Sequence, residues 1–303
     1  MSSKYDQSPQ WAHIIDTLIT EDAAAGLSNF KTSGINYKMA LWDPRPNGVR
    51  YLKDLIYNLG MQLTPENHAR LRLIQNREVG SPITVKCAGE ILCMDYLQAV
   101  YELEFISNVV RLGHANVLEI GAGYGRTCHA IISNHDVASY SIIDLPNSLE
   151  VARKYLRTVL SEQQFSKLSF IVNDDVTSPP KGMRYDLCVN INAFGEMTSE
   201  TFRNYLRFIA RHCDYFYTKN QVGKYLDKSL DGHSQGTEVV AYALSSGPLR
   251  DIVDIYDSDA VEAQRPKFID AYRPGREWVC VADGWGIPWS FYWQAVYHRG
   301  SHG

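Results

Sequence analysis

A glycine-rich turn between a strand and a helix constrains this chain more than any other stretch. Residues 117–127 read VLEIGAGYGRT, so the apolar residues of a buried strand run directly into three alternating glycines. Glycine has no Cβ and adopts positive φ, which such a tight turn requires. The helix that follows would present its N-terminus to a ligand lying against the turn. The stretch therefore predicts an α/β fold with a ligand site at this turn.

The pattern departs from the dinucleotide fingerprint G-x-G-x-x-G/A. Arg126 stands at the final position of that fingerprint, and Gly125 comes one residue too early. Glu119, two residues before the first glycine, would repel a pyrophosphate, whereas it suits a ligand that carries an ammonium and a sulfonium. An NAD(P)-dependent oxidoreductase is the alternative that this turn leaves open, and Arg126 argues against it. A tight turn that binds no ligand is the other alternative.

The stretch resembles motif I of the S-adenosylmethionine-dependent methyltransferases with a Rossmann-like fold. In that family the acidic position, here Glu119, lies beneath the amino-acid end of the cofactor. The resemblance implies that S-adenosyl-L-methionine binds and that S-adenosyl-L-homocysteine is the product. It also implies that five residues wrap the cofactor: Gly121, Ala122, Gly123, Tyr124 and Gly125.

The composition is that of a soluble globular protein and gives nucleic acid little to bind. Of the 303 residues 45% are apolar and 21% charged, which suits one large α/β domain with an accessory segment. The formal net charge is −4 and no long basic run occurs, so we expect a small-molecule partner and no nucleic acid. No His/Asp cluster has the spacing of metal ligands, so we expect no metal.

Cysteine usage and apolar patterning predict a cytoplasmic protein. The six cysteines are scattered without a C-x-x-C pair, as in a reducing compartment. Residues 1–13 lack the apolar region of a signal peptide, and no apolar stretch approaches the roughly 20 residues of a membrane span. We therefore expect no membrane partner, while a homo-oligomer stays possible.

The chain is expected to comprise a helical N-terminal cap, residues 1–111, and a methyltransferase domain, residues 112–303. In the cap, residues 14–18 indicate a first helix, and the Pro- and Gly-bearing residues 42–48 indicate a loop. Apolar residues at spacings of three and four predict a longer helix from Ile91 to Val109. Residues 222–275 are rich in glycine and proline and are expected to form a lid over the acceptor or, alternatively, a surface excursion.

Strand and helix patterns alternate along the second domain. The expected strands are 117–120, 140–144, 168–172, 185–192 and 215–218, followed by a hairpin of 277–282 and 291–297. Such an order matches the seven-stranded, mostly parallel methyltransferase sheet with an antiparallel C-terminal hairpin. Polar residues at the ends of the fourth and fifth strands would face the ligand crevice of an open α/β sheet.

Acidic residues follow the second and third expected strands. Asp144 ends the second strand 23 residues after Gly121 and would accept hydrogen bonds from both ribose hydroxyls, with Leu145 beside it. A capping aspartate is the alternative for Asp144, although Asn147, with Glu150 three residues on, already has the pattern of a helix cap. In the family an acid beyond the third strand binds the adenine amino group, which implies Asp174, with Asp175 as the alternate, unless the turn is simply acidic. Asn190 on the fourth strand is assigned to the same cofactor.

The chain from about residue 50 onward resembles the sugar O-methyltransferases of antibiotic-glycoside and surface-polysaccharide pathways. The resemblance rests on residues 93–97, the motif VLEIGAGYGRT, residues 143–146, and an N-x-N-x-x-x-E-M element at 190–197. It implies methyl transfer to a hydroxyl of a sugar or sugar-containing small molecule. An amine or carboxylate acceptor would leave the cofactor motifs unchanged, and a non-catalytic partner subunit with this fold is a further alternative.

A sugar hydroxyl is a poor nucleophile, so a base that takes its proton would help. Glu196 follows the fourth strand and is the first candidate, although a carboxylate at a helix N-terminus is also favoured by the helix dipole. His233 in the predicted lid is the second candidate, against an incidental loop histidine. Asn192, Lys219 and Asn220 are the expected acceptor-binding residues, with hydroxyls or a phosphate as their targets.

Overall fold

The computed structural model describes residues 7–20, 30–176, 184–225, 227–231 and 235–300. The chain forms two compact units, residues 1–59 and 60–303. Residues 60–111, which we expected to belong to an N-terminal cap of residues 1–111, group with the sheet-bearing unit instead. His233 lies outside the described residues, and so does the side chain of Asp175.

The first unit consists of short helices. These are α1 (Pro9–Thr17), the 3₁₀ helix η2 (Phe30–Thr32), α2 (Asn36–Met39) and most of α3 (Pro44–Met61). Ser8 caps α1, because its hydroxyl accepts the Trp11 N–H at 3.3 Å. The loop predicted for residues 42–48 is wrong from Pro44 onward, where α3 begins, with a kink at Asn47. Proline is tolerated in the first turn of a helix because the N–H it lacks has no partner there.

The second unit opens with α4 (Pro65–Leu73), a two-stranded hairpin of β1 (Thr84–Cys87) and β2 (Glu90–Cys93), and α5 (Met94–Ser107). The hairpin was not predicted. Ala88 and Gly89, both with positive φ (51° and 85°), form its two-residue turn. Ile91 lies in β2 and not in the expected helix, which begins only at Met94.

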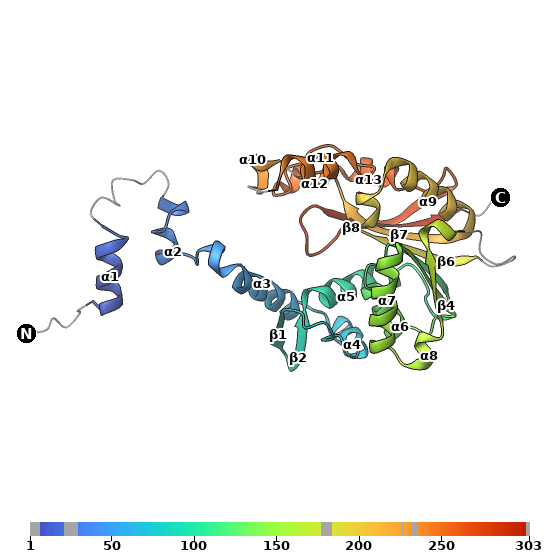
Figure 1. Ribbon diagram of the computed structural model, residues 1–303, viewed down its shortest axis with the longest axis horizontal. Helices are drawn as coiled ribbons and strands as arrows, with labels where there is room; N and C mark the ends of the chain where they lie inside the picture. The colour runs from blue at the N-terminus through green and yellow to red at the C-terminus, as the bar shows by residue number, and fades with distance from the viewer. Residues whose placement is uncertain (1–6, 21–29, 177–183, 226, 232–234, 301–303) are drawn as a thin grey trace, which may run out of the picture. The chain divides into compact units, whose positions relative to one another are not determined.

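The remaining strands form one seven-stranded sheet in the order β5-β4-β3-β6-β7-β9-β8 (Figure 1). Their bounds are β3 (Asn116–Ile120), β4 (Ser139–Asp144), β5 (Leu168–Val172), β6 (Tyr185–Ile191), β7 (Cys213–Gln221), β8 (Trp278–Trp285) and β9 (Tyr292–Arg299). The first five strands of that order run parallel, and β9 is antiparallel to β7 and β8. The predicted Rossmann-like sheet, seven-stranded and mostly parallel with an antiparallel C-terminal hairpin, is confirmed.

Helices cover both faces of this sheet. Between the strands lie α6 (Arg126–Asn134), α7 (Pro146–Val159), α8 (Glu162–Phe165), η3 (Asn173–Asp175), η4 (Ala193–Glu196), α9 (Ser199–His212), α10 (Lys228–Asp231), α11 (Thr237–Ser245), α12 (Ser258–Glu262) and α13 (Arg265–Ala271). The last four occupy the predicted insertion, residues 222–275. The expected cap at Asn147 is wrong, because α7 already begins at Pro146 and no side chain caps it.

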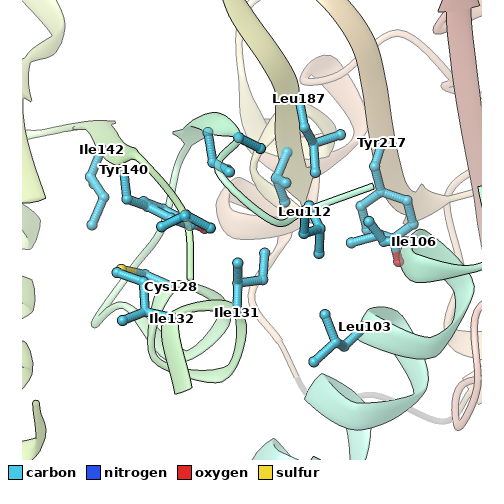
Figure 2. Close-up of a cluster of buried hydrophobic side chains, with 14 of the residues drawn as sticks. Leu103, Ile106, Leu112, Cys128, Ile131, Ile132, Tyr140, Ile142, Leu187 and Tyr217 are labelled. Carbon is cyan, nitrogen blue, oxygen red and sulfur yellow. The ribbon is translucent and has the colours of Figure 1, made fainter. Parts of the chain in front are cut away.

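Alternation along the strands divides the core between the two faces. On one face Val117, Tyr140, Ile142 and Tyr217 pack against α5, α6 and α7. Figure 2 shows Tyr140 and Ile142 beside residues of α6, and Tyr217 beside Ile106 of α5. On the other face Leu118, Ile143 and Phe216 pack with α9, α12 and α13. In Figure 1 the helices α6 and α9 accordingly lie on opposite sides of the sheet.

The topology places a crevice between β3 and β6. From β3 the chain proceeds outward to β4 and β5, then returns to add β6 and β7 on the other side of β3. The connections after these two neighbouring strands leave in opposite directions, which opens a crevice at their carboxyl ends. The turn after Ile120 and the segment after Ile191 are therefore the two walls of this crevice.

Candidate active site

A cavity of about 770 Å³ opens at the carboxyl ends of the parallel strands. This volume lies within the range of small-molecule and cofactor pockets. Ten of the sequence-predicted site residues line it: Glu119, Gly121, Ala122, Gly123, Tyr124, Asp144, Leu145, Asn192, Glu196 and Lys219. Gly125, Asp174, Asn190 and Asn220 do not line it.

The glycines of the turn differ in their surroundings: Gly121 is packed against the protein, whereas Gly123 faces open space. Gly121 has φ 75°, and a Cβ there would lie 2.3 Å from the Cβ of Ala193, so the turn can pass the segment after β6 only with glycine. Gly123 also has positive φ (57°), but no atom would lie within 4 Å of its Cβ. Its backbone therefore faces room for a ligand.

All three glycine N–H groups already have acceptors within the protein. Gly121 donates to the carbonyl of Ile143 at 2.9 Å and Gly125 to that of Ala122 at 3.0 Å. Gly123 donates to Oδ2 of Asp144 at 3.0 Å. A pyrophosphate at a dinucleotide turn depends on such backbone donors. Their use inside the protein argues against a dinucleotide ligand.

Asp144 ties the end of β4 to this turn. Besides the Gly123 N–H, its Oδ1 accepts the N–H of Leu145 at 2.7 Å. Each carboxylate oxygen has a second lone pair, so the group can still accept hydrogen bonds from a ligand in the cavity. The position fits a vicinal diol, such as the two ribose hydroxyls expected to bind Asp144.

Glu119 is a buried carboxyl at the base of the cavity, with 2% of its surface exposed. Burial raises its pKa to about 7, although the Tyr140 hydroxyl, which donates to Oε2 at 2.8 Å, and the charge of Arg126 both lower it. A cationic group above Glu119 would favour the ionised form. The residue is therefore suited to a ligand with an ammonium.

Among the described side chains that follow β5, an amide lines the cavity. Asn173 lines it, whereas the neighbouring Asp174 is exposed and accepts the Asn173 amide at 3.0 Å. The adenine-binding role of Asp174 or Asp175 stays a prediction.

Asn190 and Asn220 are completely buried in the strands β6 and β7. Asn190 donates to the Ile120 carbonyl at 2.9 Å and accepts from Asn220 at 2.9 Å. Asn220 in turn accepts the Gly195 N–H at 3.2 Å. These two amides cross-link the ends of β3, β6 and β7, and neither lines the cavity.

Glu196 stands on η4 at the other side of the cavity, exposed to it. Asn192 donates to Oε1 of Glu196 at 3.2 Å and accepts the Tyr292 hydroxyl at 2.7 Å. Asn192 has φ 62° and ψ −31°, an uncommon conformation for a residue other than glycine. Burial raises the pKa of Tyr292 to about 12, so its hydroxyl stays protonated and donates.

Lys219 is buried, and its ammonium has two partners. It follows Tyr217 by two residues and so faces α5, where its Nζ meets Oε1 of Glu102 at 2.9 Å. The same Nζ donates to the Ile287 carbonyl at 2.8 Å. The other oxygen of Glu102 forms an ion pair with Arg126 at 2.9 Å. Lys219 lines the cavity, yet its charge is used inside the protein.

This cluster of Glu102, Arg126 and Lys219 was missed in the sequence. Burial raises the pKa of Glu102, but the two cations outweigh burial and lower it, so the carboxyl is ionised. The three residues come from α5, α6 and β7, and no sequence spacing relates them.

The cavity has further walls that the sequence analysis did not assign. Asp95 and Gln98 come from α5, Trp289 comes from the segment that joins β8 to β9, and Tyr292 is the first residue of β9. Met197, Thr201 and Tyr205 follow η4 and complete the wall. Asp95 lies in the segment 93–97 that carried part of the family resemblance. That resemblance was the one feature of the sequence that pointed to any of these residues.

No helix among the described residues is long and apolar enough to cross a membrane. Within the same residues, no group of three or more His, Cys, Asp or Glu side chains is placed to hold a metal ion.

No family model matches this chain, and no curated protein matches it. Solved structures with a similar fold include an assigned O-methyltransferase from Klebsiella pneumoniae (14% identity, 84% of this chain and 100% of that chain, TM-score 0.46). Others are the CcbJ methyltransferase from Streptomyces caelestis (12%, 67% and 90%, 0.43) and the mitomycin 7-O-methyltransferase MmcR (10%, 76% and 60%, 0.43). Identities this low say nothing about the ligand or acceptor of this chain.

Proposed function

We propose that this protein is an S-adenosylmethionine-dependent O-methyltransferase whose acceptor is a hydroxyl of a sugar or sugar-containing small molecule. One observation carries the proposal: a single cavity joins the turn of Gly121 and Gly123, with Glu119 and Asp144, to the carboxylate of Glu196. The first group suits the cofactor, and the second suits an acceptor hydroxyl.

The hydrogen-bonding groups that line the cavity favour this cofactor over a dinucleotide. Glu119 and Asp144 are acceptors for an ammonium and a ribose diol, and Asn173 offers an amide for adenine. A pyrophosphate would meet two carboxylates and glycine N–H groups that are already bonded. When bound, the cofactor supplies a methyl group activated on a sulfonium, so that an O–C bond replaces an S–C bond and the acceptor loses one proton.

Glu196 is proposed to accept that proton. Asn192 fixes one carboxylate oxygen and leaves the other to face the cavity. Tyr292, Trp289 and the cavity walls would hold the acceptor and exclude water, which a methyl transfer requires. His233 and a lid role for residues 222–275 stay predictions.

The test is calorimetric titration of the purified protein with S-adenosylhomocysteine, with NADH in parallel. Micromolar binding of the first ligand alone is expected. Binding of NADH alone would overturn the cofactor assignment, and binding of neither would favour a non-catalytic subunit with this fold. Transfer of a labelled methyl group from S-adenosylmethionine to glycosides, simple amines and carboxylic acids then identifies the acceptor class, and transfer to only the last two would overturn the sugar assignment.

A further inference from the structure

On the acceptor side of the cavity, the indole ring of Trp289 forms part of the wall and is 36% exposed. Its Nε1 donates to Oε1 of Gln98 at 3.2 Å, which orients the ring against α5. Aromatic rings offer a large rigid apolar face at a small cost in conformational entropy, and Trp combines this with a polar edge.

The segment that carries Trp289 is anchored on both sides of it. Lys219 donates to the Ile287 carbonyl at 2.8 Å, and Gly286 donates to the Tyr292 carbonyl at 2.8 Å. Trp285 donates to the Ser290 carbonyl at 2.7 Å. The indole of Trp289 is thus held in place before any acceptor arrives, which lowers the entropy lost on binding.

The charges around the cavity exclude an anion. Four acidic side chains line it: Asp95, Glu119, Asp144 and Glu196. Among the described residues the cations that line it are the mostly buried Arg126 and the fully buried Lys219, and both are ion-paired with Glu102.

Lys224 is the further cation near Glu196, but it does not line the cavity. Its Nζ is directed inward and donates to the Gly195 carbonyl at 3.1 Å. Among the described residues that line the cavity, a phosphate or carboxylate on the acceptor would therefore meet acidic groups and no cation without a counter-ion, and burying an unpaired charge is costly.

We infer that this side of the cavity, formed by Trp289, Tyr292, Gln98, Asp95, Asn192 and Glu196, is a subsite for a sugar ring without negative charge. The inference rests on the proposed function. The C–H face of the ring packs on the indole, and its hydroxyls donate to the carboxylates and amides around it. The site accepts neutral glycosides and amino sugars and rejects sugar phosphates, uronic acids and nucleotide-activated sugars.

The test uses four sugars that share one ring and differ in charge: methyl glucoside, glucosamine, glucose 6-phosphate and glucuronate. Each is added to the full-length protein saturated with S-adenosylhomocysteine, and binding is measured by saturation-transfer NMR. The neutral and amino sugars are expected to bind, and the two anions at least about tenfold more weakly, a difference of about 1.4 kcal/mol. Equal or tighter binding of either anion overturns the inference, and so does binding of none of the four.

A pair of variants locates the subsite. Trp289→Leu should weaken binding of the neutral sugar about tenfold and leave S-adenosylhomocysteine affinity unchanged. Trp11→Leu is the control, since that indole is also exposed (44%) and does not line the cavity, and it should change neither. Unchanged sugar binding in Trp289→Leu would overturn the inference. Loss of S-adenosylhomocysteine binding by the wild-type protein would instead count against the proposed function.

Discussion

The side chain of Asn192 stands between Tyr292 and Glu196, with its Nδ2 3.2 Å from Oε1 of Glu196 and its Oδ1 2.7 Å from the Tyr292 hydroxyl. A carboxylate only accepts hydrogen bonds, so the NH₂ end of the amide must face Glu196. The Tyr292 hydroxyl, which stays protonated, donates to the other end. Both contacts oppose rotation of the amide, and Glu196 is held with one oxygen fixed.

Replacement of Glu196 by glutamine should slow methyl transfer at least about a hundredfold, because general bases contribute about 10²- to 10⁴-fold. Affinity for S-adenosylhomocysteine should stay unchanged. Single-turnover transfer to an acceptor from the screen, with calorimetry as the control for folding, measures both. Full activity of Glu196→Gln would remove this residue as the base.

Asn192→Asp should shift the pH profile of the same reaction. A second carboxylate beside Glu196 disfavours its ionised form, so the base loses its proton at higher pH and the rising limb of kcat/KM moves in the alkaline direction. Asn192→Ala serves as the comparison, since it removes the amide without adding charge. Coincident limbs in the wild type and Asn192→Asp would contradict the link between the two residues.

Loss of the Asp144 carboxylate should weaken S-adenosylhomocysteine binding by about ten- to a hundredfold, the range expected for hydrogen bonds to a charged group. The change also frees the Gly123 N–H, which loosens the turn. Calorimetry on Asp144→Ala measures the loss. Glu150→Ala is the control, because that carboxylate is exposed on α7 and bonds only to Lys154. Equal affinities of both variants would overturn the ribose assignment.

Glu119 should make the protein less stable as the pH rises from about 4.5 to about 7. The folded protein holds this proton up to about pH 7, whereas an unfolded glutamate loses it near 4.5. The folded state thus binds more protons in that window, and the free energy of unfolding falls as pH increases. Urea unfolding of the wild type and Glu119→Gln at several pH values isolates the effect, because other groups cancel in the difference. A difference that does not vary with pH would contradict the raised pKa.

Removal of the Glu102 charge should destabilise the protein by about 3–5 kcal/mol, because Glu102→Gln leaves Arg126 and Lys219 buried without a counter-ion. The double variant Glu102→Gln/Lys219→Met should lose less than the single variant, since one unpaired charge is gone. Urea unfolding measures both. If Glu102→Gln lowers the free energy of unfolding by less than about 1 kcal/mol, the size expected of an exposed ion pair, the cluster is accessible to solvent.

Local patterns predicted the sheet well because strand periodicity and turn chemistry are local. Residues 168–172 form β5 as expected, and Leu149, Ala152 and Leu156 form the buried face of α7. The hairpin of β1 and β2 was missed because the local pattern was misleading there. Ile91 happens to continue the three-and-four spacing of α5, although it lies in a strand, and two residues of turn gave too weak a signal.

The residues that line the cavity were predicted in part. The predictions that failed concern residues whose partners lie far away in the sequence. Lys219 and Asn220 looked like polar residues beyond the end of a strand, yet β7 continues to Gln221. Their burial is possible because Glu102 and Asn190 neutralise or bond them, and these partners are far away in sequence. Trp289 and Gln98 meet only in the folded chain, so neither stood out.

The bonded N–H groups of Gly121, Gly123 and Gly125 bear on how quickly the cofactor can enter. A turn that already closes on Ile143, Asp144 and Ala122 has no loop left to order, so the encounter itself would limit the association rate, without a slower rearrangement. The same amides should exchange slowly with deuterium in the unliganded protein.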